Sequence, residues 1–134
     1  MQEEEQVREV IIRKLEAAKV KDFSTLASLY LIDSRLTKFK DFPPYRRLEG
    51  QEVIAHEELN FAIVGDFDYK IKEFKVSLYG DFALVTFLID YKGILVNDYT
   101  FEGRSFSSSS RATIALKKEK DKWLIVHEHF SKLF

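Results

Sequence analysis

Residues 111–131, RATIALKKEKDKWLIVHEHFS, contain two runs of alternating apolar and polar residues separated by a short charged segment. A period of two is typical of a β-strand with one buried face, and a short charged segment between two such runs indicates a tight turn. We therefore expect a long strand over residues 106–117, a turn over 118–122 and a final strand over 123–131. The two strands would form an antiparallel hairpin.

Upstream of this hairpin, the same period of two begins near Asp66. Apolar residues occupy odd positions up to Ile71 and even positions from Phe74, so the pattern slips by one at Lys72-Glu73. A slip of this kind predicts either a β-bulge or a change of the buried face.

Turn residues divide the remaining strands. Gly80-Asp81 indicates a tight hairpin turn, and Asn97-Asp98 and Gly103 mark further turns. Residues 83–91 are apolar on both faces, which is typical of a strand in the middle of a sheet.

The first half of the chain carries helical patterns instead. Apolar residues recur three or four positions apart between Val7 and Ala18, which predicts one buried stripe on a helix of about four turns. Asp22 is a suitable N-cap for a short second helix. A short strand over residues 35–39 and a third helix over residues 51–63 are expected to follow.

Helices that precede strands indicate an α+β fold. We expect one domain over residues 1–134, in which the N-terminal helices cover one face of a curved antiparallel sheet of four or five strands. The chain has 134 residues, a size that suits one hydrophobic core.

Composition excludes several classes of function. The net charge is −1, which gives no support for binding to nucleic acid or to a membrane surface. The chain has no cysteine, which excludes disulfides and thiolate chemistry. The acidic N-terminus is not a signal peptide, and no apolar run is long enough to span a membrane. We therefore expect a cytoplasmic protein.

Four motifs give the chain a resemblance to a known family. Arg111-Ala112-Thr113 matches an Arg-x-Thr strand, and residues 123–131 match the pattern Trp-x-Ile-x-His-x-His-x-Ser. Residues 80–83 match Gly-Asp-x-Ala, and residues 22–30 match Asp-x-x-x-Leu-x-x-Leu-Tyr. With these motifs the chain resembles the SnoaL-like group of the nuclear-transport-factor-2-like (NTF2-like, cystatin-like) superfamily. Its last hairpin also resembles the association domain of calmodulin-dependent protein kinase.

The resemblance implies a cone-shaped α+β barrel with an open mouth, usually dimeric. Ketosteroid isomerases and polyketide cyclases share this fold with non-catalytic adaptors, so the fold leaves the function open. The isomerases carry a catalytic Asp eight residues after a helix Tyr. Here that spacing leads from Tyr30 to Lys38, and no carboxylate stands at residues 111–113 for their second acid.

The register of the last hairpin decides which residues face the inside of the cone. With Glu119 opposite Lys122, Arg111 faces Phe130 and Thr113 faces Glu128; a three-residue loop would exchange these partners. We adopt the first register. The kinase association domain supports it by resemblance, because its cavity arginines align near Asp90, Thr113 and Phe130.

In this register, Asp90, Arg111 and Glu128 would converge inside an apolar cone. Buried charges must pair, so Arg111 would bind one carboxylate. The other carboxylate would then have a raised pKa, which makes Asp90 and Glu128 candidates for a general base. A purely structural ion pair is the favoured interpretation of this group, and a site that contacts a ligand is the alternative. The residues expected to bind a ligand are Arg111, Asp90, Glu128, Thr113, Phe130 and Tyr30.

His127 and His129 alternate by two and share one face of their strand. Together with a carboxylate they could hold a metal, but packing of the pair at a sheet or dimer interface beside Trp123 is the favoured interpretation. We therefore expect no metal and no cofactor.

Three functional hypotheses remain. The first is a small-molecule-binding domain that forms a homodimer and takes a small polar or anionic ligand. The second is a lyase, isomerase or cyclase that uses Asp90 or Glu128 as general base. The third is a non-catalytic assembly module whose cone is filled by its own phenylalanines.

Overall fold

The N-terminal helices form where the apolar stripe and the cap residue predict them. In this computed structural model, which describes residues 2–97 and 102–133, α1 spans Glu3–Val20 and α2 spans Phe23–Ser28. The stripe of α1 is buried against the sheet. Asp22 caps α2 by accepting a hydrogen bond from the Thr25 backbone N–H at 3.2 Å.

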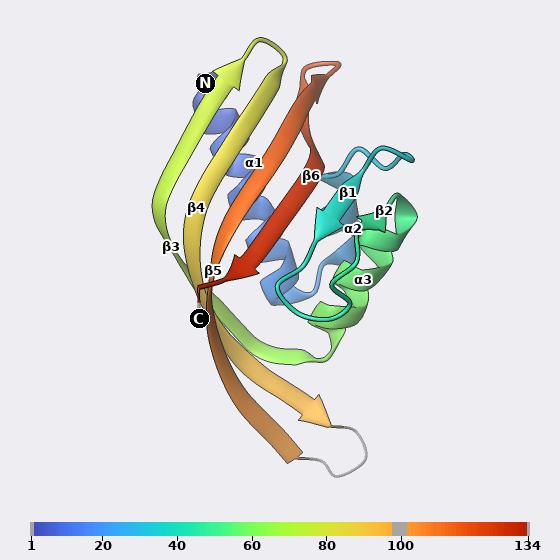
Figure 1. Ribbon diagram of the computed structural model, residues 1–134, viewed down its shortest axis with the longest axis vertical. Coiled ribbons are helices and arrows are strands. Elements are labelled where there is room, and N and C mark those ends of the chain that lie inside the picture. Colours follow the sequence, from blue (N-terminus) through green and yellow to red (C-terminus); the bar gives the residue numbers. More distant parts are fainter. Residues whose placement is uncertain (1, 98–101, 134) are drawn as a thin grey trace.

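Six strands form one curved, unclosed sheet in the order β2-β1-β6-β5-β4-β3 (Figure 1). The last four form the expected antiparallel meander, while α1 crosses behind them and α3 lies beside β1. The bounds are β1 Thr37–Phe39, β2 Leu48–Glu49, α3 Gln51–Ala62, β3 Val64–Tyr79, β4 Phe82–Asn97, β5 Glu102–Glu119 and β6 Lys122–Lys132.

The expectation of a wholly antiparallel sheet of four or five strands is wrong at one edge, where β2 adds a sixth strand and the pairing of β1 is not antiparallel to both neighbours. β1 runs parallel to β6, with Thr37 beside His127 and Phe39 beside His129. The parallel pairing arises because the chain enters β1 from the α2 segment, which also makes a parallel bridge between Tyr30 and Ile125 of β6. The sheet is therefore mixed.

The prediction of a turn at Gly103 is also wrong, because Gly103 lies within β5. β4 and β5 pair without interruption from Phe82 and Lys117 to Asn97 and Glu102, and they extend beyond the other strands as an arm (Figure 1). A Cβ atom on Gly103 would lie 2.7 Å from Ile94 Cγ2, so this glycine permits a close cross-strand contact. Asp98, which also belonged to the expected turns, lies outside the described residues.

Three register shifts interrupt the pairing within the described residues. One lies between Gly65 and Asp68 of β3, and the other two are β-bulges that bear on the sequence predictions. The first bulge lies in β3 between Lys72 and Lys75, as the slip in the apolar pattern predicted, and Glu73 adopts the left-handed region there with φ +53°. The second bulge lies in β6, where Ala115 pairs with His127 and Leu116 pairs with Ile125. No pattern in the sequence predicted this second bulge.

The bulge in β6 overturns part of the predicted register. Glu119 lies opposite Lys122 as expected, but Val126 is the extra residue of the bulge, so every later pair shifts by one. Arg111 pairs with Ser131 rather than Phe130, and Thr113 pairs with His129 rather than Glu128. The predicted cross-strand partners are therefore wrong, because an added residue reverses the faces beyond it.

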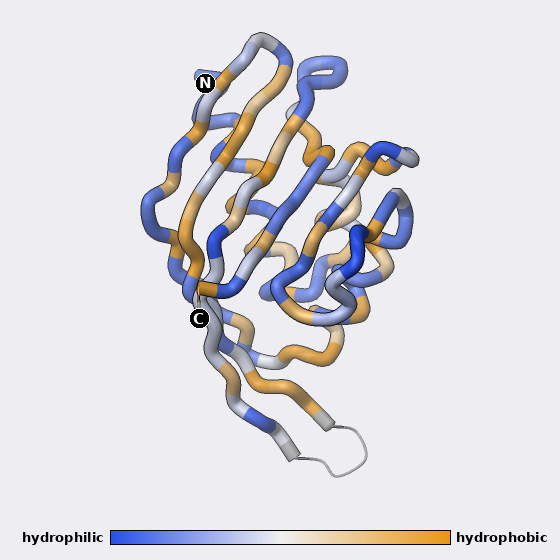
Figure 2. Tube along the Cα trace, in the orientation of Figure 1, coloured by the Kyte–Doolittle hydropathy of each residue, from blue (hydrophilic) through white to orange (hydrophobic). Residues whose placement is uncertain are grey.

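The core lies between the inner face of the sheet and the helices. β4 has a hydrophobic stretch in Figure 2, and Val85 and Ile89 on its inner face are 0% and 2% exposed. This agrees with its predicted place inside the sheet. No helix in residues 2–97 and 102–133 is long and apolar enough to cross a membrane.

Substitutions at Glu73 test the positive φ of this bulge residue. A β-branched residue is strongly disfavoured at positive φ, so Glu73→Val should lower the free energy of unfolding by about 1–2 kcal/mol, measured by urea denaturation. Glu73→Gly should change it by less than about 1 kcal/mol. Lys75→Val, at an exposed position just past the bulge, is the control and should also have little effect. Equal losses for the two valine variants would contradict a bulge at residue 73.

Candidate functional site

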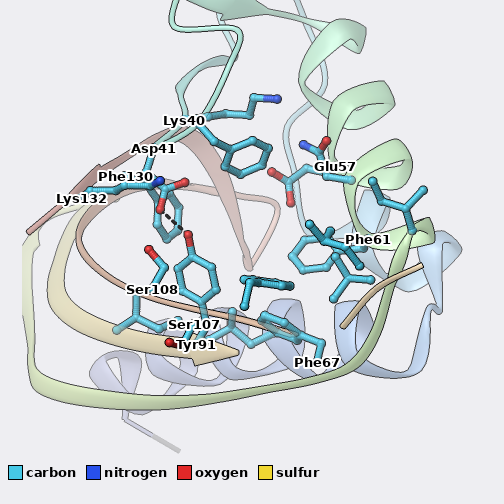
Figure 3. Close-up of a pocket in the computed structure, with 18 of the residues that line it drawn as sticks. Lys40, Asp41, Glu57, Phe61, Phe67, Tyr91, Ser107, Ser108, Phe130 and Lys132 are labelled. Atoms are coloured by element: carbon cyan, nitrogen blue, oxygen red, sulfur yellow. Dashed lines mark hydrogen bonds between the residues drawn. The ribbon is translucent and has the colours of Figure 1, made fainter. Parts of the chain in front are cut away.

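A cavity of about 540 Å³ lies between the inner face of the sheet and helices α1 and α3 (Figure 3). Its wall is mostly apolar and rich in aromatic rings. Apolar and aromatic lining residues include Leu15, Phe42, Phe61, Val64, Phe67, Ile89, Tyr91, Leu95, Phe106 and Phe130. Volume and lining are those of a typical small-molecule pocket.

Five buried side chains form a network at one side of this cavity. Lys38 Nζ contacts Glu57 Oε1 and lies 3.2 Å from Glu128 Oε1, while Lys14 Nζ lies 3.3 Å from Glu128 Oε2 and 3.7 Å from Glu57 Oε2. The Tyr30 hydroxyl donates a hydrogen bond to Glu128 Oε1 at 2.8 Å. We call these five residues the buried charge cluster.

Each member of the cluster comes from a different element. Lys14 lies on the buried face of α1, and Glu57 lies on the buried face of α3. Lys38 is the middle residue of β1, and the parallel register places it directly beside Glu128 of β6. Tyr30 follows α2. The cluster therefore joins the helices to the edge of the sheet.

The charges of the cluster compensate one another. Burial alone would raise the pKa of Glu57, but Lys14 and Lys38 outweigh it and hold this pKa at about 2. Burial would lower the pKa of Lys38, but the carboxylates of Glu128 and Glu57 raise it above its usual value. Burial and the Glu128 charge raise the pKa of Tyr30. Near neutral pH, Glu57 is thus a carboxylate, Lys38 is an ammonium ion and Tyr30 is a neutral phenol.

A second polar group faces the cavity from another side. Asp41 accepts a hydrogen bond from the Tyr91 hydroxyl at 2.6 Å (Figure 3). It also accepts a hydrogen bond from the Ser110 hydroxyl. Burial and the hydrogen bond to Asp41 raise the pKa of Tyr91 to about 12. Tyr91 is therefore a neutral phenol, and its hydroxyl proton is already used in the hydrogen bond to Asp41.

The structure brings together three of the residues predicted to bind a ligand. Glu128 and Tyr30 belong to the buried charge cluster. Phe130 lines the cavity, and the ammonium nitrogens of Lys38 and Lys14 lie 5.0 and 5.3 Å from the centre of its ring. The ring therefore lies against the cations of the cluster.

The other three predicted residues lie on the outer face of the sheet. Asp90 pairs with Lys72 at 2.8 Å and accepts a hydrogen bond from Ser109 at 2.6 Å, and these contacts lower its pKa. Arg111 is exposed and Thr113 is half-buried beside it on β5. The structure does not bring these side chains together with Glu128, because buried inner-face residues alternate with them along β4 and β5.

Comparison with known proteins identifies the family. Residues 7–134 match the SnoaL-like domain. The chain belongs to the SnoaL-like domain family. No curated protein matches this SnoaL-like domain in sequence.

Solved structures share its fold. A candidate dehydratase of the NTF2-like family from Streptomyces avermitilis has 25% identity and a TM-score of 0.84, covering 97% of this chain and 96% of that one. An NTF2-like superfamily protein from Salmonella enterica has 16% identity and a TM-score of 0.82, with 96% and 89% covered. The CaMKII hub of S. rosetta has 22% identity and a TM-score of 0.75, with 98% of both chains covered.

The predictions for this SnoaL-like domain missed the partners of Glu128. Lys14 lies within the apolar stripe of α1, and Glu57 follows Val53 and Ile54 by four and three residues on the buried face of α3. A charged residue inside a buried stripe must find a partner, so these two positions were a usable signal. Lys38 is the residue that the isomerase spacing reaches, eight positions after Tyr30.

The two histidines of β6 lie on the outer face. His127 Nδ1 is 2.7 Å from the Thr37 hydroxyl, and Phe39 contacts the rings of both histidines. Burial lowers the pKa of His127, and the neighbouring His129 lowers it further. Residues 2–97 and 102–133 contain no group of three or more His, Cys, Asp or Glu side chains that could hold a metal.

The charge cluster predicts that the stability of the SnoaL-like domain falls in acid. The pKa of Glu57 is about 2 in the folded protein against 4.5 in a free side chain, so its stabilisation is complete above about pH 4.5 and is lost as the pH falls toward 2. Glu57→Gln should lower the free energy of unfolding by about 3 kcal/mol at pH 7 and flatten its decrease below pH 4.5, measured by urea denaturation.

Glu5→Gln is the matched control for this test. Glu5 is an exposed carboxylate in the first turn of α1, so the control should retain the acid dependence of the parent protein. A Glu57→Gln variant with an unchanged acid profile would contradict an ionised, paired Glu57.

Proposed function

We propose that this SnoaL-like domain binds a small, largely aromatic or apolar molecule in the cavity of the cone. The observation that carries the proposal is the cavity itself, about 540 Å³ in volume, with phenylalanine walls and buried polar groups from Lys38, Asp41 and Glu57. Pockets of this size and lining are typical of ligand sites. Phe130 is proposed to contact the ligand, while Glu128 and Tyr30 position the residues that do.

A reaction catalysed by a carboxylate base is the alternative, and the similarity to a candidate dehydratase favours it. Two observations support binding instead. Glu128, although buried, is not among the described residues that line the cavity. Glu57 does line it, but Lys14 and Lys38 hold its pKa at about 2, which makes it a weak proton acceptor.

The binding proposal is tested with 1-anilinonaphthalene-8-sulfonate, a probe whose fluorescence rises in an apolar site. We expect saturable binding of one probe per chain. Ser108→Trp places a large ring at a lining position, so it should weaken binding about tenfold or more by filling the cavity.

Two controls accompany this titration. Ser105→Trp adds the same ring to an exposed position of β5 that does not line the cavity, and Arg111→Ala changes the outer face. Both should bind the probe as the parent protein does. Equal binding by Ser108→Trp and Ser105→Trp would contradict a site in the cavity.

We also propose that the domain associates with a second copy of itself through the outer face of the sheet. The half-buried side chains of Leu84, Leu88, Leu124 and Phe39 lie on strands β4, β6 and β1 and leave apolar surface on this face. The similarity in fold to the CaMKII hub of S. rosetta supports self-association. Association would remove the apolar surface from water.

Leu84→Asp should convert the associated form to the monomer, because a carboxylate would be buried at the interface. Size-exclusion chromatography with light scattering measures the mass. Val20→Asp, at an exposed apolar position on α1, is the control and should keep the parent mass. A parent protein that is monomeric at high micromolar concentration would contradict the proposal.

A further inference from the structure

One oxygen in the cavity lacks a hydrogen bond. Glu57 Oε2 is buried and has no hydrogen-bond donor among the residues that the structure describes. Its neighbour Lys14 Nζ lies 3.7 Å away, beyond hydrogen-bond distance, while Glu57 Oε1 is engaged by Lys38. Glu57 lines the cavity, and its carboxylate lies beside the open space in Figure 3.

This oxygen can only accept a hydrogen bond. Lys14 and Lys38 keep Glu57 ionised, and an ionised carboxylate has no proton to donate. A buried carboxylate oxygen without a donor is costly, so a group that enters the cavity with a donor would relieve that cost. Glu128 Oε2 also lacks a hydrogen bond, but Glu128 does not line the cavity within the described part of the chain.

The donor should be uncharged. Lys14 and Lys38 already compensate Glu57 and Glu128, so a cationic group beside Glu57 would be repelled by two ammonium ions. An anionic group would meet the carboxylate directly. A neutral hydroxyl group supplies a proton to Glu57 Oε2 without adding charge to the cluster.

The rest of the ligand should be an aromatic ring system. The rings of Phe61 and Phe67 are 5.1 Å apart in an edge-to-face arrangement, and Phe67 and Tyr91 are 6.3 Å apart. These side chains line the cavity together with Phe106 and Phe130. A flat ring that enters the cavity can join such contacts, which favours it over an aliphatic chain of equal area.

We propose that the cavity recognises hydroxylated aromatic compounds, with the ligand hydroxyl donating its hydrogen bond to Glu57 Oε2. The inference rests on the proposed binding function and adds the chemical class of the ligand. Glu57 is the residue that determines specificity, while the phenylalanine walls bind the ring without regard to its substituent.

Three probes with the same ring system test the inference on the parent protein at pH 7. 2-Naphthol carries a donor, 2-methoxynaphthalene has the same oxygen without a donor, and 2-naphthoate carries an anion. Calorimetric or fluorescence titration should show 2-naphthol binding about ten- to a hundredfold more tightly than 2-methoxynaphthalene, as expected for a hydrogen bond to a charged group. 2-Naphthoate should bind more weakly than 2-naphthol.

The Glu57→Gln variant tests whether Glu57 causes the preference for 2-naphthol over 2-methoxynaphthalene. Glu57→Gln can keep an oxygen on Lys38 and turn its NH₂ group toward the cavity, so the ratio of the 2-naphthol and 2-methoxynaphthalene affinities should fall toward one. Glu52→Gln is the matched control, because Glu52 lies on the same helix and pairs with Arg46 at the surface. It should keep the parent ratio.

The outcomes separate this inference from the binding proposal. Equal affinities of the parent protein for 2-naphthol and 2-methoxynaphthalene would overturn the role of Glu57 and leave the cavity as a general apolar site. Tightest binding of 2-naphthoate would also overturn it and would point to an anion site at a lysine. Failure of all three probes and of the sulfonate dye would overturn the binding proposal and this inference together.

Discussion

Burying two ammonium ions and two carboxylates in one place is the constraint on which this structure depends. Each charge would be very costly to bury alone, so all four must meet in one geometry. Lys14 comes from α1, Lys38 from β1, Glu57 from α3 and Glu128 from β6. The relative positions of α1, α3 and the sheet are therefore coupled through a single set of contacts.

The same constraint separates the two sides of the sheet. The inner face carries the charge cluster and the cavity, whereas the outer face carries Asp90 and Arg111 as solvent-facing groups. Successive residues of each strand point to opposite faces, so the position of a charged residue along its strand decides whether it is buried or faces solvent. A ligand in the cavity meets a site whose charges are already compensated, so its own uncharged polar groups become the means of discrimination.

Most of the fold could be predicted from local patterns. The stripe of α1, the Asp22 cap, the bulge near Glu73 and the Gly80 turn each depend on residues close together in the chain. The parallel pairing of β1 with β6 was missed, because it joins segments about ninety residues apart and leaves no periodic signal.

The site was harder to predict for one physical reason. Glu128, Tyr30 and Phe130 were identified, but the bulge at Val126 shifted the register and left Arg111 and Thr113 on the outer face. A bulge of one residue is invisible where both faces of a strand carry mixed residues, as they do around Val126. Lys14 and Glu57 could have been found, because a charged residue inside an apolar stripe requires a partner.

The parallel pairing of β1 with β6 has a consequence for how the chain acquires its site. Lys38 and Glu128 are neighbours in the sheet but lie about ninety residues apart in the sequence. Closing such a long loop costs conformational entropy, and the contacts that offset this cost form only when both strands are in place. During synthesis the hairpin of β3 and β4 can form before β6 has left the ribosome, because it joins neighbouring segments of the chain. The cavity and the charge cluster are then completed last, when β6 adds Phe130 to the cavity wall and Glu128 to the cluster.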